Sequence, residues 1–402
     1  MKKRMVRVFV LILACLCLFA GCNPGNNDEG VTQGSDTAPE ETKESKHEFQ
    51  LLDDGTYGIK LGATNDEVDL VIPGRYNGKA VTKILPNGFK NAIHLKSVKI
   101  SKGITEIGEN AFSGCTALTT VTIPDSIVSI GASAFSGCSA LTSVTIPDSV
   151  TSIGASAFSN CIAMKSATIL DNVTSIGAGV FSGCTSLESL MIPFVAADAE
   201  SADNLCFGYF FGAETHRDNP TTVPASLATL TITDGKSIGR LAFDSCENLK
   251  KIVILNGVTS IGDFAFCGCT NLESITFADS VTTMGENIFA DCGKLSSVIL
   301  SQNLTRIEFG TFAMCTALTS IMIPDSVTYI GEDAFASCSA LTSVTIGTGV
   351  EYIDANAFSS CEKLTSIVYS GNKDRWNAIQ KDHHWYGNSG KPIVSCTDGE
   401  IK

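Results

Sequence analysis

Apolar and polar residues alternate along most of this chain in a pattern that recurs every 23 residues. Within residues 141–146, a leucine, a valine and an isoleucine alternate with hydroxyl-bearing residues, which is typical of a short β-strand with one buried face. Pro147 cannot donate a hydrogen bond to a strand ladder and Asp148 favours a turn, so the strand is expected to end there. A fixed period of this length predicts a solenoid, in which one unit stacks many times.

The second half of each repeat predicts another extended segment and then a tight turn. Residues 150–153 continue the apolar pattern, and Gly154 is expected to form a corner by adopting backbone angles that other residues avoid. Ala157, Phe158 and Cys161 follow as a 3₁₀ or short helical turn that fills the core. The predicted fold class is a repeat solenoid, mainly β, with the spacing of leucine-rich repeats.

Twelve strand units align on this template, and nearly every unit has a phenylalanine at the same place. The units begin at Leu95, Leu118, Leu141, Met164, Leu187, Leu227, Leu249, Leu272, Leu295, Leu318, Leu341 and Leu364. The phenylalanines are Phe89, Phe112, Phe135, Phe158, Phe181, Phe243, Phe266, Phe289, Phe312, Phe335 and Phe358. We expect their rings to stack as a column, each pair adding about 0.5–1.5 kcal/mol beyond area burial.

The repeat resembles a known bacterial family. The segments IPDSVTSIGASAFSNC (146–161), VTSIGDFAFCGC (258–269) and IPDSVTYIGEDAFASC (323–338) are similar to the BspA-type leucine-rich repeats of bacterial surface proteins. The resemblance runs from about residue 81 to residue 369. It implies a secreted or surface-anchored protein that adheres to host matrix proteins or to other cells. The family motif fixes no binding residues, so none is assigned from it.

Cysteine marks the end of each repeat, at Cys115, Cys138, Cys161, Cys184, Cys246, Cys269, Cys292, Cys315, Cys338 and Cys361. These thiols either pair or bind metal, or they are small buried apolar groups. Side chains in a straight ladder point in parallel and offer no converging ligands, so we favour buried groups and predict neither metal nor cofactor. Cys206 and Cys396 lie outside the ladder, and a disulfide between them would span half the rod. The adjacent His383 and His384 do not share one face as a metal pair would need.

The N-terminal segment predicts export. Residues 1–21 carry basic residues followed by an apolar run, as in a secretory signal peptide. The sequence Leu-Phe-Ala-Gly-Cys at 18–22 is similar to the bacterial lipobox, and this resemblance implies lipidation of Cys22. An ordinary cleaved signal with an incidental cysteine is the alternative. Residues 22–46 are polar and predict a flexible tether, so the chain would meet the membrane only through its lipid.

Caps are expected at both ends of the solenoid, which we place at residues 81–369. The N-terminal cap, residues 47–80, contains a predicted strand at 68–73 and a hairpin turn at 76–79. The C-terminal cap, residues 370–402, contains a predicted short helix at 373–379. It also holds the chain's two tryptophans, Trp376 and Trp385.

The period breaks once, where residues 194–226 form an insertion. Insertions in repeat proteins often lie on the binding face, and this one combines aromatic residues with charge, as interface hot spots do. Its candidate partner-binding residues are Phe207, Tyr209, Phe210, Phe211, His216 and Arg217. The alternative is that the aromatic rings pack back onto the rod.

The outward strand positions form a second candidate surface. Thr142, Ser143 and Thr145 and their equivalents should stack as hydroxyl ladders, which stabilise a sheet or, alternatively, bind glycans or an extended protein. Lys250 and Lys251 interrupt this pattern close to the insertion and complete the set of candidate residues.

Charge and motifs narrow the function. The net charge is −14 and becomes more negative without the basic leader, which argues against nucleic acid as a partner. No Ser-His-Asp set, phosphate loop or zinc spacing departs from the repeat, so we predict that the chain is not an enzyme. The sequence favours an envelope-anchored lipoprotein that binds an extracellular protein or glycan. A structural envelope component without a specific ligand is the alternative.

Overall fold

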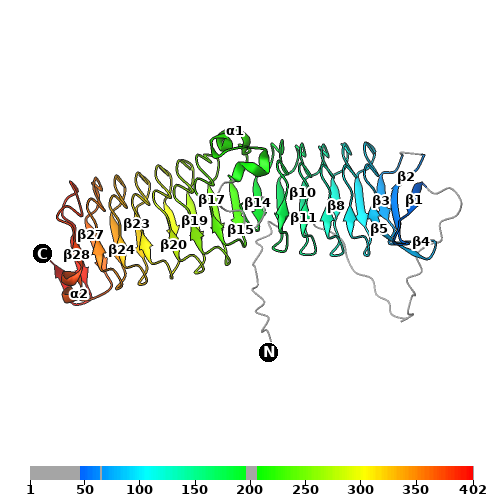
Figure 1. Cartoon of the computed structure of the whole chain (residues 1–402). Coiled ribbons are helices and arrows are strands. Elements are labelled where there is room, and N and C mark those ends of the chain that lie inside the picture. The colour runs from blue at the N-terminus through cyan, green and yellow to red at the C-terminus, as the bar shows by residue number, and fades with distance from the viewer. Residues whose placement is uncertain (1–45, 64–65, 196–205, 402) are drawn as a thin grey trace, which may run out of the picture. The chain divides into compact units, whose positions relative to one another are not determined.

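The computed structural model describes residues 46–63, 66–195 and 206–401. The chain divides into two units, residues 1–40 and 41–402. The predicted signal peptide, Cys22, most of the predicted tether and residues 196–205 of the insertion lie outside the described residues. In the second unit, the turns of a β-solenoid stack along one axis (Figure 1), which confirms the predicted fold class.

The first strand of every repeat lies on one face of the solenoid. These strands are β3 (Asp69–Ile72), β6 (Ser97–Ile100), β8 (Thr120–Thr122), β10 (Ser143–Ile146), β12 (Ser166–Ile169), β14 (Ser189–Ile192), β15 (Thr229–Ile232), β17 (Lys251–Ile254), β19 (Ser274–Phe277), β21 (Ser297–Ile299), β23 (Ser320–Ile323), β25 (Ser343–Ile346), β27 (Ser366–Tyr369) and β29 (Ile393–Cys396). Paired strands run parallel and in register, so Val144 lies opposite Ala167 and both are buried. Strands β3 and β29 add a turn at each end of the twelve units expected from the sequence.

The second extended segment of each repeat forms another face. Its strands are β5 (Lys79–Ile84), β7 (Glu106–Ile107), β9 (Ser129–Ile130), β11 (Ser152–Ile153), β13 (Ser175–Ile176), β16 (Ser237–Ile238), β18 (Ser260–Ile261), β20 (Thr283–Met284), β22 (Arg306–Ile307), β24 (Tyr329–Ile330), β26 (Tyr352–Ile353) and β28 (Gln380–Lys381). The insertion interrupts this face between β13 and β16, whereas β14 pairs directly with β15 on the first face.

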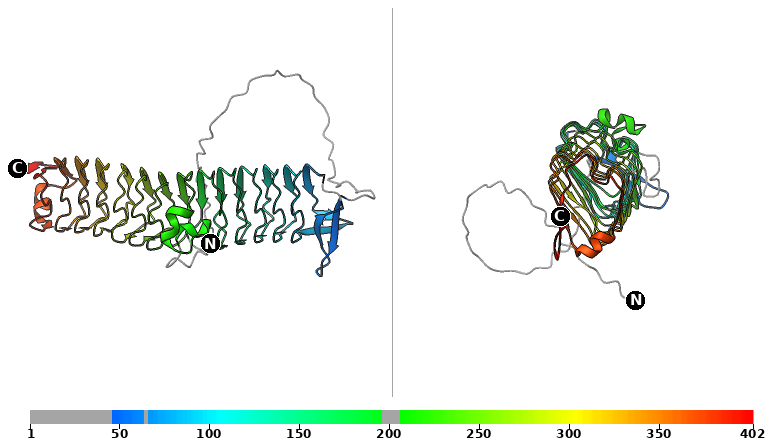
Figure 2. Two further views of the ribbon diagram at one scale, coloured as in Figure 1. Left: turned by 90° about the horizontal axis from the view of Figure 1, so that it is seen from above. Right: turned by 90° about the vertical axis from the view of Figure 1, so that its left-hand side faces the viewer.

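The third side of the solenoid consists of hydrogen-bonded turns rather than helices. The N–H of Cys115 donates to the carbonyl of Phe112 at 3.2 Å, a three-residue separation as expected for a tight turn. The N–H of Phe112 also donates to Ala134 in the next repeat at 2.7 Å. Each turn of the solenoid is therefore hydrogen-bonded to its neighbour on three sides, and these sides enclose the core in the view along the axis (Figure 2).

Glycine at the corner serves a purpose that differs from the prediction. Gly154 does not adopt a positive φ; instead, a Cβ there would lie 2.3 Å from the backbone nitrogen of Ala132. The positive φ angles fall two and six residues later, at Ser156 (φ 56) and Asn160 (φ 56). The expectation of special backbone angles at Gly154 is therefore wrong, and close packing of adjacent repeats explains this glycine.

The phenylalanine column is confirmed. Nine of the ten successive pairs have ring centroids 5.0 to 6.0 Å apart and interplanar angles of no more than 23°. At the insertion, Phe207 packs against Phe243 instead, with centroids 4.8 Å apart. The column continues into both caps, where His47 contacts Phe89 at 6.0 Å and Trp385 contacts Phe358 at 5.9 Å.

The cysteine ladder lies inside the solenoid, and all of its thiols are free and buried. Nine of the ten ladder thiols donate to the carbonyl of a column phenylalanine 26 residues earlier, at 3.1 to 3.4 Å. Burial raises the pKa of Cys292, for example, which keeps this thiol protonated and able to donate. The interpretation as small buried groups is confirmed, with a hydrogen-bonding role that the sequence did not predict. Cys206 and Cys396 are also free thiols.

The ends of the solenoid contain antiparallel strands. At the N-terminal end, β1 (His47–Leu51) pairs with β2 (Tyr57–Leu61), and β4 (Arg75–Tyr76) forms the predicted hairpin with β5. At the C-terminal end, α2 (Lys373–Ala378) is the predicted short helix, and β30 (Gly399–Ile401) pairs with β29. No helix in the described part of the chain has the length and hydropathy needed to cross a bilayer.

Candidate functional site

The insertion supplies the third segment of one enlarged repeat. The 3₁₀-helix η1 (Phe207–Phe211) occupies the place of the usual turn. Its carbonyls at Tyr209 and Phe210 accept hydrogen bonds from Gly179 and Phe181, each at 2.8 Å, and the N–H of Phe207 donates to Ala242 at 2.8 Å. The stack therefore continues through the insertion.

The predicted aromatic contact residues of the insertion are mostly internal. Phe207, Phe210 and Phe211 are buried, and the ring of Phe207 lies 4.8 Å from that of Phe243. These three rings pack onto the rod, as the alternative interpretation stated, and they present no surface to a partner in this structure. Tyr209 is half-buried.

The polar part of the insertion is fastened by one buried amide. Two short helices, η2 (His216–Asp218) and α1 (Asn219–Thr222), follow η1. Asn219, the first residue of α1, accepts a hydrogen bond from the N–H of Gly208 at 2.9 Å. It also donates to the carbonyls of Ala242 and Asp244, at 3.3 and 3.1 Å. Asn219 is 0% exposed.

The charged candidates remain at the surface. His216 is half-buried, whereas Arg217, Lys250 and Lys251 are exposed. They stay candidates for partner binding.

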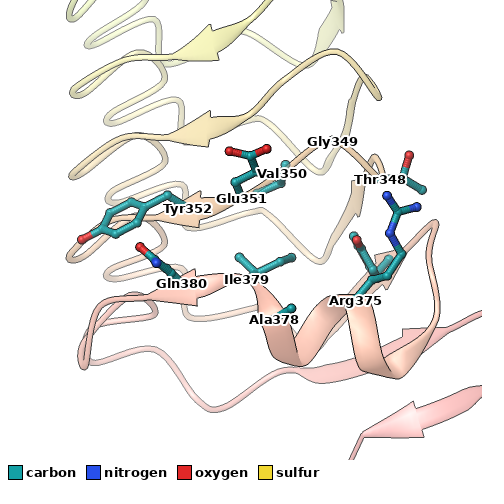
Figure 3. Close-up of a pocket in the computed structure, with 10 residues that line it drawn as sticks. Thr348, Gly349, Val350, Glu351, Tyr352, Arg375, Ala378, Ile379 and Gln380 are labelled. Atoms are coloured by element: carbon teal, nitrogen blue, oxygen red, sulfur yellow. The ribbon is translucent and has the colours of Figure 1, made fainter.

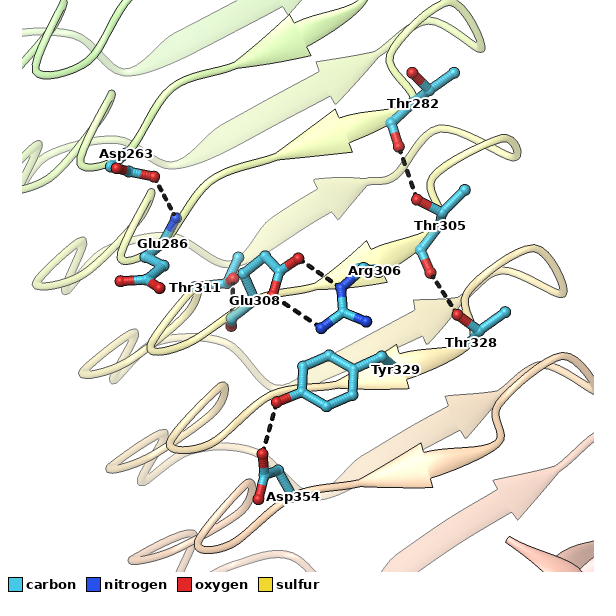
Figure 4. A network of polar contacts seen from close by, with 10 residues as sticks. All are labelled: Asp263, Thr282, Glu286, Thr305, Arg306, Glu308, Thr311, Thr328, Tyr329 and Asp354. Atoms are coloured by element: carbon cyan, nitrogen blue, oxygen red, sulfur yellow. Dashed lines mark hydrogen bonds and ion pairs between the residues drawn. The ribbon is translucent and has the colours of Figure 1, made fainter. Parts of the chain in front are cut away.

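Some hydroxyls of the ladders form hydrogen bonds within the fold. Thr119 and Thr342 each donate to the carbonyl of the preceding repeat at 3.0 Å. On the second segment, Thr328 donates to Thr305 and Thr305 to Thr282, each at 3.2 Å (Figure 4). These bonds support the interpretation that the ladders stabilise the sheets.

The second face departs from the repeat near its C-terminal end. Its outward strand position is serine or threonine in six repeats on either side of the insertion, at Ser129, Ser152, Ser175, Ser237, Ser260 and Thr283. The following strands carry Arg306, Tyr329 and Tyr352 instead, and β28 carries Gln380. Sequence reasoning missed this change, although aligning the repeats column by column would have found it.

Two carboxylates complete this departure. Glu308 and Asp354 replace the glycine that follows the second strand in most repeats, at Gly108, Gly131, Gly154, Gly177, Gly239, Gly262, Gly285 and Gly331. We call Arg306, Glu308, Tyr329, Tyr352 and Asp354 the Arg-Tyr patch.

The side chains of the Arg-Tyr patch contact one another, and Figure 4 shows all of them except Tyr352. The guanidinium of Arg306 forms an ion pair with Glu308 at 2.7 Å and lies 3.8 Å from the ring centroid of Tyr329. Tyr352 stacks on Tyr329 with centroids 5.8 Å apart, and the hydroxyl of Tyr329 donates to Asp354 at 2.6 Å. Long side chains are thus ordered at a surface that is otherwise lined by small ones.

The protonated forms of Tyr329 and Arg306 are the ones that make these contacts. Burial raises the pKa of Tyr329 to about 12, and the hydrogen bond to Asp354 acts in the same direction. The hydrogen bond to Glu308 likewise raises the pKa of Arg306. At neutral pH the phenol therefore remains a donor and the guanidinium remains charged.

A cleft of about 460 Å³ lies beside the patch, between the last regular repeat and α2 (Figure 3). Its polar lining comprises Thr348, Glu351, Tyr352, Tyr369, Arg375 and Gln380. Tyr352 belongs to both the patch and the cleft, so the two form one continuous candidate surface.

A second groove, of about 510 Å³, follows the N-terminal part of the same face. It is lined mainly by serine and glycine at the repeat positions, including Ser129, Ser152 and Gly154. Small side chains of this kind offer few anchors for a partner, which makes the Arg-Tyr patch the better candidate.

Among the described residues, no group of three or more histidine, cysteine, aspartate or glutamate side chains could hold a metal ion.

Family comparison agrees with the geometry of the repeat. Six copies of the model described as "BspA type Leucine rich repeat region" match residues 82–209 and 236–365, together more than half of the chain. The chain belongs to the BspA-type leucine-rich repeat family. Solenoids of this class typically serve as non-catalytic binding scaffolds. No curated protein matches the chain.

Solved structures of leucine-rich repeat proteins are similar to the chain. A leucine-rich cell surface protein from Faecalibacterium prausnitzii is 30% identical, over 87% of this chain and 99% of that one, with a TM-score of 0.36. A leucine-rich repeat protein from Bacteroides ovatus is 23% identical, over 87% and 98%, with a TM-score of 0.40. One from Eubacterium ventriosum is 22% identical, over 89% and 98%, with a TM-score of 0.40.

Proposed function

We propose that the chain is a non-catalytic adhesion module of a bacterial envelope, which contacts an extracellular protein or glycan through the Arg-Tyr patch. The observation that carries this proposal is the replacement of serine by arginine and tyrosine in successive repeats, with supporting carboxylates at Glu308 and Asp354. Arginine and tyrosine are enriched at binding hot spots. Side chains that are ordered before binding lose less conformational entropy when a partner arrives.

Attachment to the envelope forms part of the proposal. The basic and apolar leader followed by Leu-Phe-Ala-Gly-Cys supports export and a lipid on Cys22. Membrane fractionation of cells expressing the full chain tests this, and Cys22→Ala should move the protein to the soluble exported fraction. A Cys22→Ala protein that stays with the membrane would contradict the lipid anchor.

Binding is tested with variants that restore the chain's own repeat. Arg306→Ser combined with Tyr329→Ser introduces the residue found in other repeats at each position, so the fold should be retained. We expect this variant to bind immobilised matrix proteins and bacterial cells at least about tenfold more weakly than the wild type, because hot-spot residues dominate affinity. Surface plasmon resonance and cell pull-down provide the measurement.

The matched control is Lys250→Thr combined with Lys251→Ser. It introduces the residues of other repeats at two exposed candidate residues outside the patch. Unchanged binding in this control, with a loss in the patch variant, supports the patch. The reverse result would move the contact site to the lysines. If the wild type binds neither matrix protein nor cells, the proposal fails and a purely structural envelope role is favoured.

A further inference from the structure

The first face of the solenoid carries a balanced set of charges near its middle. The outward position just before each strand of this face is threonine, serine or alanine in most repeats. On both sides of the insertion it is charged instead, and these four charged side chains are exposed. We call the five successive positions Lys165, Glu188, Ala228, Lys250 and Glu273 the charged column. The whole chain has a net charge of −14, whereas this column is neutral.

The charged column is centred on the middle strand of a sheet. Strand β15 is the fourth of seven strands, from β10 to β21, that form one continuous hydrogen-bonded sheet. Glu188 and Lys250 precede its two neighbours, β14 and β17, while Lys165 and Glu273 precede the next strands, β12 and β19. At each step outward from β15, a glutamate on one side therefore corresponds to a lysine on the other.

A second copy of the chain can pair with every charge of this column. Two first faces that are related by a twofold axis along β15 have antiparallel rod axes and keep equivalent strand positions opposite each other. Lys165 then faces Glu273 of the second copy, and Glu188 faces its Lys250. Symmetry makes each contact twice. The solenoid of residues 46–401 is nearly straight in two views (Figures 1 and 2), so two such faces can approach each other over several strands.

The charges also select this register against its neighbours. Displacement of the second copy by one strand in one direction brings Lys165 opposite Lys250. Displacement by one strand in the other direction brings Glu188 opposite Glu273. Like charges that face each other disfavour a contact, so only the register centred on β15 pairs all four charges with opposite ones.

Apolar side chains of the same face are covered in this register. Met191 and Val253 are half-buried and lie on either side of Thr231, so the twofold axis places each opposite the other. Ile299 is 56% exposed on β21 and lies opposite Thr145, on β10 of the second copy. Burial of these side chains adds a hydrophobic contribution to the electrostatic one.

We propose that the chain forms an antiparallel homodimer through its first face, with Thr231 of β15 next to the twofold axis. Seven strands of about four residues, spaced by about 4.8 Å, offer roughly 400 Å² of flat area per copy. A standard stable interface buries about 800 Å² per partner, so the dissociation constant is expected in the micromolar range. The Arg-Tyr patch lies on the second face, which stays exposed in this dimer. Each dimer thus presents two patches, one toward each of its ends.

The test is the association state of the full chain carrying Cys22→Ala, which removes the proposed lipid. Sedimentation velocity between about 1 and 200 µM should show a monomer–dimer equilibrium. Added NaCl should shift this equilibrium toward the monomer, because the paired charges are exposed to solvent.

Charge reversal tests the pairing. Glu188→Lys combined with Glu273→Lys makes all four charges positive and should weaken dimerisation at least about tenfold. Adding Lys165→Glu and Lys250→Glu to this variant restores opposite charges both within and between the chains. The fourfold variant should therefore dimerise as the wild type does.

The matched charge control is Glu109→Lys combined with Glu332→Lys. Both glutamates are exposed and lie outside the first face, and the control changes the net charge by the same amount as the Glu188 and Glu273 variant. Dimerisation should be unchanged in this control. Thermal unfolding of each variant verifies that the fold is retained.

Crosslinking tests the register. Thr231→Cys lies next to the twofold axis, so a short bis-maleimide should join the two copies there. Thr145→Cys lies about 29 Å, six strand separations, from its own equivalent in the dimer and should not be joined. The parent chain is the control for Cys267 and Cys396, which are only partly buried.

The inference is overturned if the chain stays monomeric over this concentration range, or if the fourfold variant fails to recover the dimer that the twofold variant loses. It is also overturned if Thr145→Cys is joined as readily as Thr231→Cys. Adhesion is measured separately, below the dissociation constant of the dimer, where the Lys250 and Lys251 control reports direct contact with the partner. A dimer without adhesion would contradict the proposed function alone, and adhesion by a chain that never dimerises would contradict the dimer alone.

Discussion

Single residues of the repeat are constrained by their neighbours in the next repeat. Gly154 illustrates this, because a Cβ at this position would overlap the backbone of Ala132, and Gly131 and Gly177 meet the same close approach. The backbone of Ser156 is strained in a different way, with a positive φ that glycine tolerates better. Contact between repeats thus constrains Gly154, whereas local backbone conformation constrains Ser156.

Substitutions at these two positions should have different effects. Gly154→Ala should lower the free energy of unfolding by at least about 2 kcal/mol, because the methyl group forces adjacent repeats apart. Ser156→Gly should change it by no more than about 1 kcal/mol, since relief of strain offsets the added chain entropy. Urea unfolding followed by circular dichroism measures both. Equal destabilisation by the two variants would contradict the assignment of these roles.

The sequence alone could not reveal the role of Gly154 or the side-chain contacts within the Arg-Tyr patch. A glycine at a corner is compatible with positive φ and with close packing, and only the position of Ala132 decides between them. The patch depends on Glu308 and Asp354 reaching residues on the strands of the same face. Such contacts require the stacking register as well as the local pattern.

At the scale of elements, the sequence predicted the strands but did not decide how the insertion packs. Alternation of apolar and hydroxyl residues predicted the strands because one face of each is buried. Helix η1 continues the stack through bonds from Gly179 and Phe181, which belong to the preceding repeat. Since those contacts are not local, the aromatic residues of the insertion resembled a binding site when considered alone.

Asn219 should control how firmly the insertion is attached. Asn219→Ala leaves the N–H of Gly208 and the carbonyl of Asp244 without their present partner, whereas the carbonyl of Ala242 keeps its bond from the N–H of Phe207. We expect a loss of about 2–3 kcal/mol in the free energy of unfolding, together with faster proteolytic cleavage within residues 206–226. Thermal unfolding and limited proteolysis measure these effects.

Glu214→Ala, at an exposed position of the same segment, is the control and should behave like the wild type. If Asn219→Ala shows no change in cleavage rate, the insertion must be held by its buried phenylalanines instead.

For the solenoid as a whole, the 23-residue period predicted the fold class and the pairing of equivalent strands. The register was correct because the same residue of each repeat pairs with its equivalent, as Ser152 does with Ser129 and Ser175. The ends were harder to assign, because β3 and β29 have diverged from the template and still extend the first face. Stacking against a regular neighbour permits this divergence.

Removal of one complete repeat should be tolerated. Deletion of residues 141–163 brings β8 against β12 with equivalent residues facing each other, so circular dichroism and cooperative unfolding should be retained. Deletion of only residues 141–151 joins unlike segments and should abolish cooperative unfolding. Size-exclusion chromatography and thermal melts distinguish these outcomes, and equal damage by both deletions would contradict stacking by whole repeats.

In-register stacking also has a genetic consequence. Recombination between similar repeat-coding segments adds or removes 23 codons, and each event keeps the reading frame and the three hydrogen-bonded sides. The distance from the N-terminal cap to the Arg-Tyr patch can therefore change in steps of about 4.8 Å, one strand separation, while the patch itself is unaltered. Rod length can thus evolve separately from binding specificity.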